Sequence, residues 1–333
     1  MRALRSHEAG GPETLRLDEL PDPVPGKGEV RITVKSAAIN FPDTLIIRDL
    51  YQFRPARPFA PGAEVAGVVD AVGEGVTDWN VGDRVVALMV FGGLAEKILV
   101  SARRLYALPD GVSFDAGAAL LLTYGTSIHA LKDRGRIKPG ETLLVLGAAG
   151  GVGLAAVELG KAFGARVVAA VSSEEKAQAA RAAGADETVI YPRQPFDRDQ
   201  AKALTEAFKA ACGPAGAQVI YDAVGGDYSE PALRAIGWEG RFLVVGFPAG
   251  IARMPLNLTL LKSCDVCGVF YGAFTERDPA ANAAHVAELF ELLAAGSISP
   301  RITATYSLER AADAIAALEN RSAIGKLVVR MGD

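Results

Sequence analysis

The feature that most constrains the fold is an apolar run that ends in a dense group of glycines. Residues 142–146 read TLLVL, and residues 147–153 read GAAGGVG. The first run suits a buried strand, and the alanine-rich stretch after the glycines suits a helix. Glycines at such a junction let the backbone approach a phosphate closely, while the helix start offers free N–H groups. The pattern predicts a dinucleotide site at Ala149, Gly150, Gly151 and Val152.

The spacing of these glycines departs from the usual dinucleotide fingerprint, because Gly147, Gly150 and Gly153 are each three residues apart. The context supports the prediction all the same. Further strands are expected at residues 166–171, 187–190, 218–221 and 241–245, with helical segments between them. This alternation indicates an α/β fold, with a doubly wound parallel sheet covered by helices. The pattern GxxxxGKS/T is absent, which argues against a P-loop nucleotide hydrolase.

The first 120 residues have a different texture, rich in β-branched residues, glycine and proline. Short strands are expected at residues 30–34, 64–69, 84–87 and 96–100, with turn sequences between them. We expect a small, partly open β-barrel. At the other end of the chain the pattern predicts helices around residues 286–293 and 308–319 and a last strand at 326–331.

Bulk properties narrow the function classes. A chain of 333 residues is long for one core, which favours two domains. A net charge of -4 argues against a nucleic-acid partner, and no apolar run is long enough to span a bilayer. The first residues lack the apolar stretch of a secretory signal, and three cysteines are too few for a disulfide framework. We expect a cytoplasmic protein that binds neither nucleic acid nor membranes.

The end of the second expected strand bears on the choice of cofactor. An NAD site wants a carboxylate there for the ribose 2′-hydroxyl, but the strand ends in Ser172 and a second serine. The glutamates that follow are interpreted as part of a capping box from Ser172 to Glu175. Lys176 lies one turn further on, and Tyr191 closes the next strand. A hydroxyl, an ammonium and a phenol suit a 2′-phosphate, so NADPH is the predicted cofactor.

Several short motifs, taken in order with the glycine turn, carry a family resemblance. They are AINFPD at 38–43, FAPGAEVAG at 59–67, GDRV at 82–85, residues 124–131 and YDAVGG at 221–226. The chain resembles a quinone oxidoreductase of the medium-chain dehydrogenase/reductase superfamily. The resemblance implies a GroES-like catalytic domain split over residues 1–122 and 266–333, with a Rossmann domain at 123–265. It also implies a homodimer in which an edge strand near residues 265–271 pairs with its copy.

The resemblance implies roles for individual residues. Thr126, Gly246 and Phe270 belong to the cofactor site, the first two near the nicotinamide. Ser172, Lys176, Tyr191 and Arg321 match positions that hold the adenosine phosphate.

Zinc-containing relatives would place a histidine where this chain has Ala63 and a cysteine where it has Asn40. Residues 88–106 contain no cysteine, and none of the three histidines lie at a spacing typical of a metal site. We therefore expect a protein without a metal.

A hydride transferred to a conjugated acceptor leaves negative charge on the carbonyl oxygen, which a hydrogen-bond donor stabilises. Asn40 and Tyr51, on loops of the first domain, are the predicted donors, and the predicted acceptor is a quinone or another α,β-unsaturated carbonyl compound. Two alternatives stay open at this point: a reductase of enoyl-CoA thioesters resembling acryloyl-CoA, and a protein that binds NADPH without catalysis.

Overall fold

The computed structural model describes residues 1–320 and 323–332, and the chain divides into two units. Unit 1 contains Met1–Leu122 and Pro300–Asp333, and unit 2 contains Thr123–Ser299. The second boundary lies after residue 299, not after residue 265 as expected from the sequence. The reason is that strand β13 (Asp265–Gly268) pairs with a strand of unit 2, and the two helices after it pack onto the same unit.

Unit 2 is a six-stranded parallel sheet in the order β10-β9-β8-β11-β12-β13. The strands are β8 (Thr142–Leu146), β9 (Arg166–Val171), β10 (Glu187–Ile190), β11 (Ala217–Asp222), β12 (Ile236–Val244) and β13. The order reverses between β8 and β11, and such a switch point is where doubly wound sheets bind nucleotides. All five residues of β8 are buried, as expected for a strand with helices on both sides.

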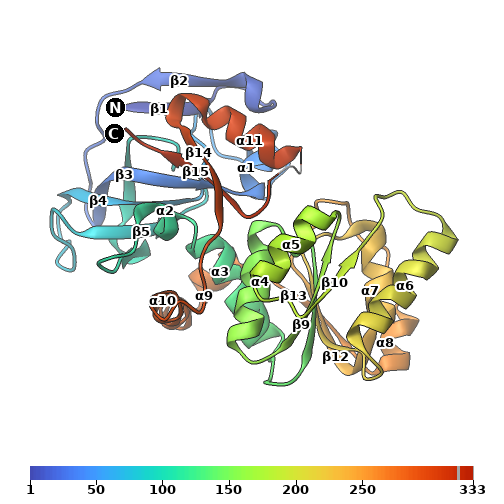
Figure 1. The fold of residues 1–333 in the computed structure, drawn as a ribbon. Helices are drawn as coiled ribbons and strands as arrows, with labels where there is room; N and C mark the ends of the chain where they lie inside the picture. The colour runs from blue at the N-terminus through green and yellow to red at the C-terminus, as the bar shows by residue number, and fades with distance from the viewer. Residues whose placement is uncertain (321–322, 333) are drawn as a thin grey trace. The chain divides into compact units, whose positions relative to one another are not determined.

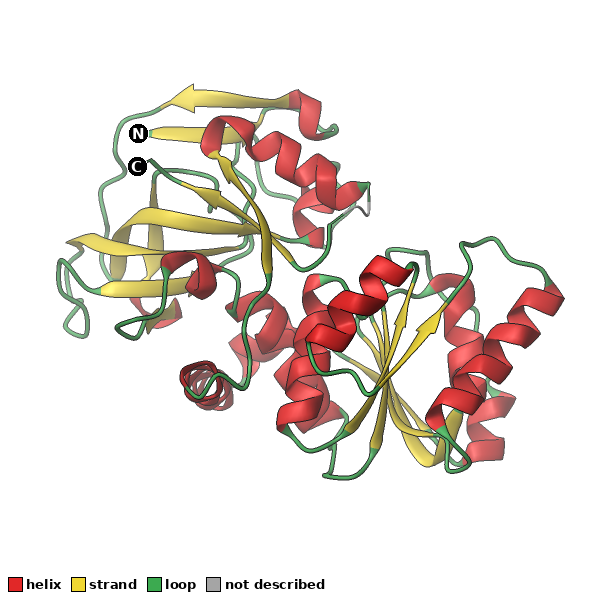
Figure 2. Ribbon diagram, viewed as in Figure 1, coloured by secondary structure: helices red, strands yellow, loops and turns green. Residues whose placement is uncertain are grey.

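Helices cover both faces of this sheet, with α4 and α5 on one face and α6 and α7 on the other (Figures 1 and 2). The helices are α3 (Leu121–Ile128), α4 (Gly151–Ala162), α5 (Glu174–Ala182), α6 (Arg198–Cys212), α7 (Ser229–Arg234), α8 (Asn257–Lys262), α9 (Tyr271–Arg277) and α10 (Pro279–Ala294). Residues His129–Arg134 continue α3 as a π-helical turn. The strand expected over residues 265–271 ends at Gly268, and α9 begins at Tyr271.

Unit 1 is a curled sheet with strand order β14-β15-β3-β4-β5-β7 and β6 paired to β3. Its strands are β1 (Arg2–Ser6), β2 (Leu15–Glu19), β3 (Glu29–Ile39), β4 (Glu64–Val72), β5 (Arg84–Leu88), β6 (Lys97–Ser101), β7 (Leu105–Ala107), β14 (Ile302–Ser307) and β15 (Lys326–Arg330). Three short helices complete it: α1 (Phe41–Ile46), α2 (Phe114–Ala118) and α11 (Ala311–Glu319). The expected GroES-like fold is confirmed.

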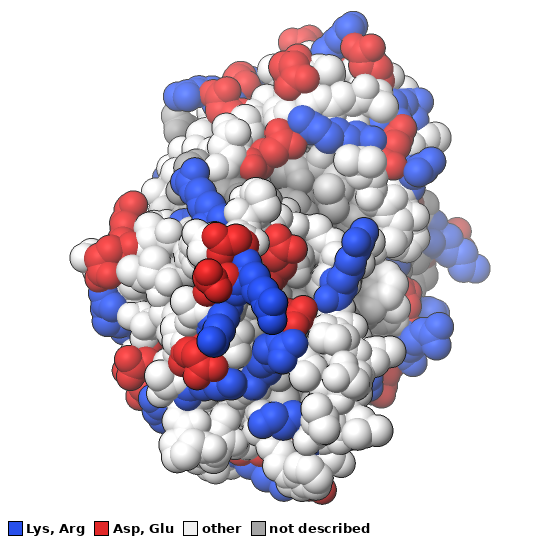
Figure 3. Space-filling model, turned by 90° about the vertical axis from the view of Figure 1, so that its right-hand side faces the viewer, with Lys and Arg blue, Asp and Glu red and all other residues white. Residues whose placement is uncertain are grey.

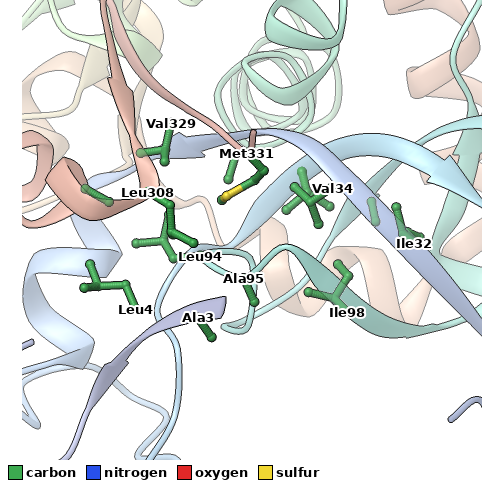
Figure 4. Close-up of a cluster of buried hydrophobic side chains, with 14 of the residues drawn as sticks. Ala3, Leu4, Ile32, Val34, Leu94, Ala95, Ile98, Leu308, Val329 and Met331 are labelled. Atoms are coloured by element: carbon green, nitrogen blue, oxygen red, sulfur yellow. The ribbon is translucent and has the colours of Figure 1, made fainter. Parts of the chain in front are cut away.

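The long strand β3 organises unit 1, because it pairs with β4, β6 and β15. Through β15 the C-terminal end of the chain joins a sheet that the N-terminal third began. The apolar core beneath this sheet draws on both ends of the chain: Figure 4 shows Leu4, Val34 and Leu94 beside Leu308 and Val329. The buried cluster therefore ties the two chain segments of unit 1 into one domain.

On the face shown in Figure 3, basic side chains are interspersed with acidic ones and do not form one continuous field. Among the described residues no helix is both long enough and apolar enough to cross a membrane.

Candidate functional site

The predicted dinucleotide turn joins β8 to α4. Gly147 adopts a positive φ of 72°, and a side chain on Gly153 would bring its Cβ within 2.1 Å of the Gly147 carbonyl oxygen. Both positions therefore need glycine. The N–H groups of Gly147 and Ala148 donate to the Ala170 carbonyl on β9, which pins the turn to the neighbouring strand.

The start of α4 presents the predicted phosphate-binding groups. Gly150 is the exposed N-cap, Gly151 and Val152 are half-buried at the first turn, and Ala149 is buried beneath them. The first N–H groups of any helix have no acceptor within the helix. They point away from its N-terminus, where the helix dipole also favours an anion. The turn fits a pyrophosphate.

A buried hydroxyl pair that the sequence did not reveal supports this turn. Ser127 donates to the carbonyl oxygen of Val152 at 3.0 Å and lies 2.9 Å from the Tyr221 phenol oxygen. Next to Tyr221, the buried carboxylate of Asp222 accepts hydrogen bonds from the N–H groups of Val224 and Gly225. The signal was present in the motif YDAVGG, which carried the family resemblance without an assigned role.

Three residues predicted to hold the adenosine phosphate come together at the ends of β9 and β10. The Lys176 ammonium donates to Ser172 Oγ at 3.1 Å. The backbone N–H of Tyr191 donates to the carbonyl oxygen of Val171 at 2.9 Å, which places Tyr191 beside the same strand end. Ammonium and hydroxyl thus meet at the end of β9, and this pair fits a 2′-phosphate. The ring of Tyr191 packs against Tyr228, with the ring centroids 4.7 Å apart.

The capping of α5 corrects one expectation. The N-cap is Ser173, whose Oγ accepts the N–H of Lys176 at 3.3 Å. The residue three positions after this cap is a lysine, so no capping box with Glu175 forms. Because Ser173 caps the helix, the Ser172 hydroxyl is left to the Lys176 side chain.

The remaining predicted cofactor residues lie on other elements of unit 2. Thr126 is half-buried on α3, Phe270 is 52% exposed at the start of α9, and Gly246 follows β12 with its N–H bonded to the Asp222 carbonyl. Beside Thr126, a Cβ on Gly125 would lie 2.2 Å from the Tyr271 hydroxyl, so that neighbour must be glycine. Arg321 lies outside the described residues.

Asn40 is buried in unit 1 and both hydrogens of its amide are already engaged. Nδ2 donates to the Ala38 carbonyl at 3.2 Å and to Glu64 Oε1 at 2.9 Å. Its Oδ1 accepts the ammonium of Lys326 at 2.6 Å. Both amide hydrogens are thus used within unit 1, which argues against the predicted role of Asn40 as a donor to the acceptor.

Tyr51 has a different environment. Its half-buried ring packs against the apolar core of unit 1, and its phenol makes no hydrogen bond to another described residue. Burial and the nearby charge of Asp43 raise the pKa of Tyr51, so the phenol keeps its proton at neutral pH. Tyr51 therefore remains available as a neutral hydrogen-bond donor.

Asp43 lies in α1 and joins the start of that helix to the turn at Gly62. Its carboxylate accepts the N–H of Asn40 at 2.7 Å and that of Gly62 at 2.9 Å, while only 1% of the residue is exposed. Burial raises the pKa of Asp43 to about 6, against the opposing effect of these hydrogen bonds. The start of α1 and the Gly62 turn are thus held by a carboxyl group whose pKa is raised to about 6.

The residues of unit 1 do not fit the zinc of related dehydrogenases. Asn40 and Glu64 both bind the Lys326 ammonium, Ala63 has no ligand atom, and the three cysteines all belong to unit 2. Across the part of the chain that the structure describes, no group of three or more side chains could hold a metal ion.

Two histidines that lie 156 positions apart in the sequence meet in unit 2. His129 Nδ1 is 2.6 Å from Asp133 Oδ2, and His285 Nε2 is 3.4 Å from Asp133 Oδ1. The ring of Phe274 stacks on His129, and burial lowers the pKa of His129. The cluster packs the π-helical turn onto α9 and α10.

Comparison with known proteins places this fold and site in a family. The family model for the alcohol dehydrogenase GroES-like domain matches residues 26–110, and that for zinc-binding dehydrogenases matches residues 151–288. Quinone oxidoreductase-like protein 2 of Rattus norvegicus is 37% identical over 322 residues, covering 96% of this chain and 89% of that protein. Quinone oxidoreductase of Homo sapiens is 32% identical over 332 residues, covering 99% and 97%.

A solved structure of Escherichia coli quinone oxidoreductase complexed with NADPH has a TM-score of 0.90 and 32% identity. The match covers 99% of this chain and 100% of that chain. The fold and the site together define an oxidoreductase that uses a dinucleotide cofactor. The chain belongs to the quinone oxidoreductase family of the medium-chain dehydrogenase/reductase superfamily.

Proposed function

We propose that the protein transfers a hydride from NADPH to a quinone or another α,β-unsaturated carbonyl compound, and that it does so without zinc. The observation that carries the proposal is the occupied metal position: the amide of Asn40 and the carboxylate of Glu64 hold an ammonium. Oxidation of a simple alcohol asks for a Lewis acid or a base at the hydroxyl, whereas a conjugated acceptor needs only a donor at its carbonyl oxygen.

NADPH is the cofactor that the binding groups of unit 2 favour. The first turn of α4 suits the pyrophosphate, and Lys176 with Ser172 and Tyr191 suits the 2′-phosphate. The Escherichia coli relative of known structure was solved with NADPH, which supports the same assignment.

Bound NADPH supplies the hydride, and the chain's own residues position the reactants and stabilise the product. Tyr51 donates its phenol hydrogen to the carbonyl oxygen on which negative charge develops. Because its pKa is raised, Tyr51 stays protonated and does not itself carry a charge that would repel the product. Asp43 joins the start of α1 to the turn at Gly62 through the N–H groups of Asn40 and Gly62. Water supplies the final proton.

An acceptor panel tests the proposal. NADPH oxidation should be followed with quinones, enones, 2-haloacrylates and enoyl-CoA thioesters, using protein dialysed against a chelator. Turnover with quinones or simple enones is the expected result. Turnover with enoyl-CoA thioesters alone would favour the thioester reductase, and tight NADPH binding without turnover on any acceptor would favour a non-catalytic binding protein. Activity that is lost on chelation and restored by zinc would contradict the proposed zinc independence.

We also propose that the protein is a homodimer, and that it lies in a reducing compartment such as the cytoplasm. Strand β13 is an edge strand with Val266 44% exposed, and neighbouring α8 exposes Leu260 at 79% and Leu261 at 62%. An open edge beside exposed leucines suits strand pairing with a second copy. The three cysteines are free thiols, as in a reducing compartment. Sedimentation equilibrium should give twice the mass of the chain, and a monomer at micromolar concentration would contradict the proposed dimer.

A further inference from the structure

We propose that Lys326 is a positioning residue for the acceptor reaction: its ammonium is a built-in cation that neutralises Glu64 and fixes Asn40, whose backbone N–H is also held by Asp43. The inference rests on the proposed function and deepens it. It assigns a role to a residue from the last strand of the chain.

The contacts of the ammonium are complete. Lys326 begins β15, and its Nζ donates to Asn40 Oδ1 at 2.6 Å, to Glu64 Oε1 at 2.6 Å and to the Ile39 carbonyl at 3.5 Å. An ammonium has three hydrogens, so each has an acceptor. The Lys326 side chain is 3% exposed and that of Glu64 1% exposed, so water screens the pair very little.

Glu64 is equally well bound. Its Oε1 also accepts the amide of Asn40 at 2.9 Å, and its Oε2 accepts the N–H of Leu122 at 2.9 Å. A buried ion pair of this kind need not stabilise the fold more than apolar residues would. Removing one partner alone, however, leaves an uncompensated buried charge. Lys326 therefore neutralises the charge of Glu64, which would be uncompensated without it.

A second buried carboxylate lies in the same region. Asp43 is influenced by both members of the pair, since Lys326 lowers its pKa and Glu64 raises it. The charge of Asp43 in turn acts on Tyr51. With Lys326 present, the two carboxylates and the ammonium sum to -1 when all are ionised; without it they sum to -2. An acceptor anion forming at Tyr51 would meet that added repulsion in a region of low dielectric constant.

The experiment compares four variants with the wild type: Lys326→Met, Glu64→Gln, the double variant of both, and Lys35→Met as a matched control. Lys35 is an exposed lysine on β3 of the same unit. For each protein, kcat on a slowly reacting enone is measured at pH 6 and pH 8. Melting temperature and NADPH affinity by fluorescence titration are measured alongside, because neither needs turnover.

The proposal predicts that Lys326→Met lowers kcat about 10-fold or more at pH 8 with NADPH affinity unchanged within about two-fold. Adding Glu64→Gln should restore kcat to within about three-fold of the wild type at both pH values. Lys35→Met should behave as the wild type.

A merely structural lysine gives a different pattern. If kcat of Lys326→Met equals the wild type, or falls and stays low in the double variant, the inference is wrong. Should Lys326→Met fail to fold, Glu64→Gln alone decides: it keeps the cation, so its kcat should not fall, and a folded variant with kcat about 10-fold lower contradicts the inference. If the wild type shows no turnover, the proposed function itself is contradicted. If the wild type is active and the variants are unaffected, only the role of Lys326 is contradicted.

Discussion

The Lys176 ammonium lies 3.1 Å from the Ser172 hydroxyl, at the end of the second strand of the parallel sheet. The next residue, Ser173, takes over the capping of α5, which leaves the two side chains to each other. Tyr191 is tied to the same strand end through the carbonyl of Val171. The ammonium and the hydroxyl stand in place of the carboxylate that would hold a ribose 2′-hydroxyl.

Lys176→Ala should reduce the preference for NADPH over NADH about 10- to 100-fold, because one charge-assisted contact to the 2′-phosphate is lost. The measurement is kcat/KM for both cofactors with one quinone. NADH values should stay within about two-fold of the wild type, since NADH has no phosphate there. Lys202→Ala, at an exposed position on α6, is the control. A wild type that uses both cofactors equally well would refute the phosphate assignment.

Tyr51→Phe should lower kcat on a slowly reacting enone about 100-fold, because the phenol is the proposed donor to the developing oxyanion. Reactive quinones need less stabilisation and should show a smaller loss. Stability should change little, since the phenol makes no hydrogen bond to another described residue. Tyr306→Phe, on β14 of the same unit, serves as the control. Unchanged enone turnover in Tyr51→Phe would mean that solvent stabilises the product anion.

Asn40→Ala should act mainly on stability. The amide bonds Glu64, Ala38 and Lys326, so its loss leaves buried polar atoms without partners and should lower the free energy of unfolding by about 1–3 kcal/mol. Urea denaturation measures this directly. A variant that unfolds like the wild type but loses about 100-fold in kcat would restore the catalytic role first expected for Asn40.

Asp43→Asn should change how stability depends on pH. Burial raises the pKa of Asp43 from 3.8 to about 6, so the folded state favours its protonated form. This contribution is full in acid and is lost as pH rises through about 6. Asparagine does not titrate, so the unfolding free energy of the variant relative to the wild type should rise by roughly 1–2 kcal/mol from pH 5 to pH 8. Asp78→Asn, at an exposed position, is the control and should show no such change. If Asp43→Asn also shows no change with pH, Asp43 is ionised across this range and the raised pKa is contradicted.

Local patterns in the sequence were sufficient for much of unit 2. The bounds expected for β8, β9 and β10 agree with the structure, because each is an apolar run between turn residues. β12 was harder: it begins at Ile236, five residues before the expected start, and contains Glu239 with a positive φ of 56°. Its first residues pair out of register with the rest, and no hydrophobic periodicity records such an irregularity.

The parts of the site that the sequence did not reveal depend on contacts between distant residues. Lys326 bonds Asn40 across 286 positions, and nothing in a strand that reads KLVVR distinguishes its lysine from a solvent-exposed one. The bonds from the Asn40 amide to Ala38 and Glu64 argue against the donor role predicted for Asn40, and an asparagine on a loop gives no sign in the sequence that its amide hydrogens are already used. The dinucleotide turn was predictable because its glycines and helix start are consecutive in the chain.

Deuterium labelling shows whether the protein transfers a hydride from NADPH to a conjugated acceptor without zinc. Chelator-treated protein is incubated with an enone and NADPH carrying deuterium at one or the other face of nicotinamide C4, and the product is analysed by mass spectrometry and NMR. We expect one of the two labelled cofactors to deliver deuterium to the β-carbon of the product. A product without cofactor deuterium from either, or turnover that appears only after zinc is added, would contradict it.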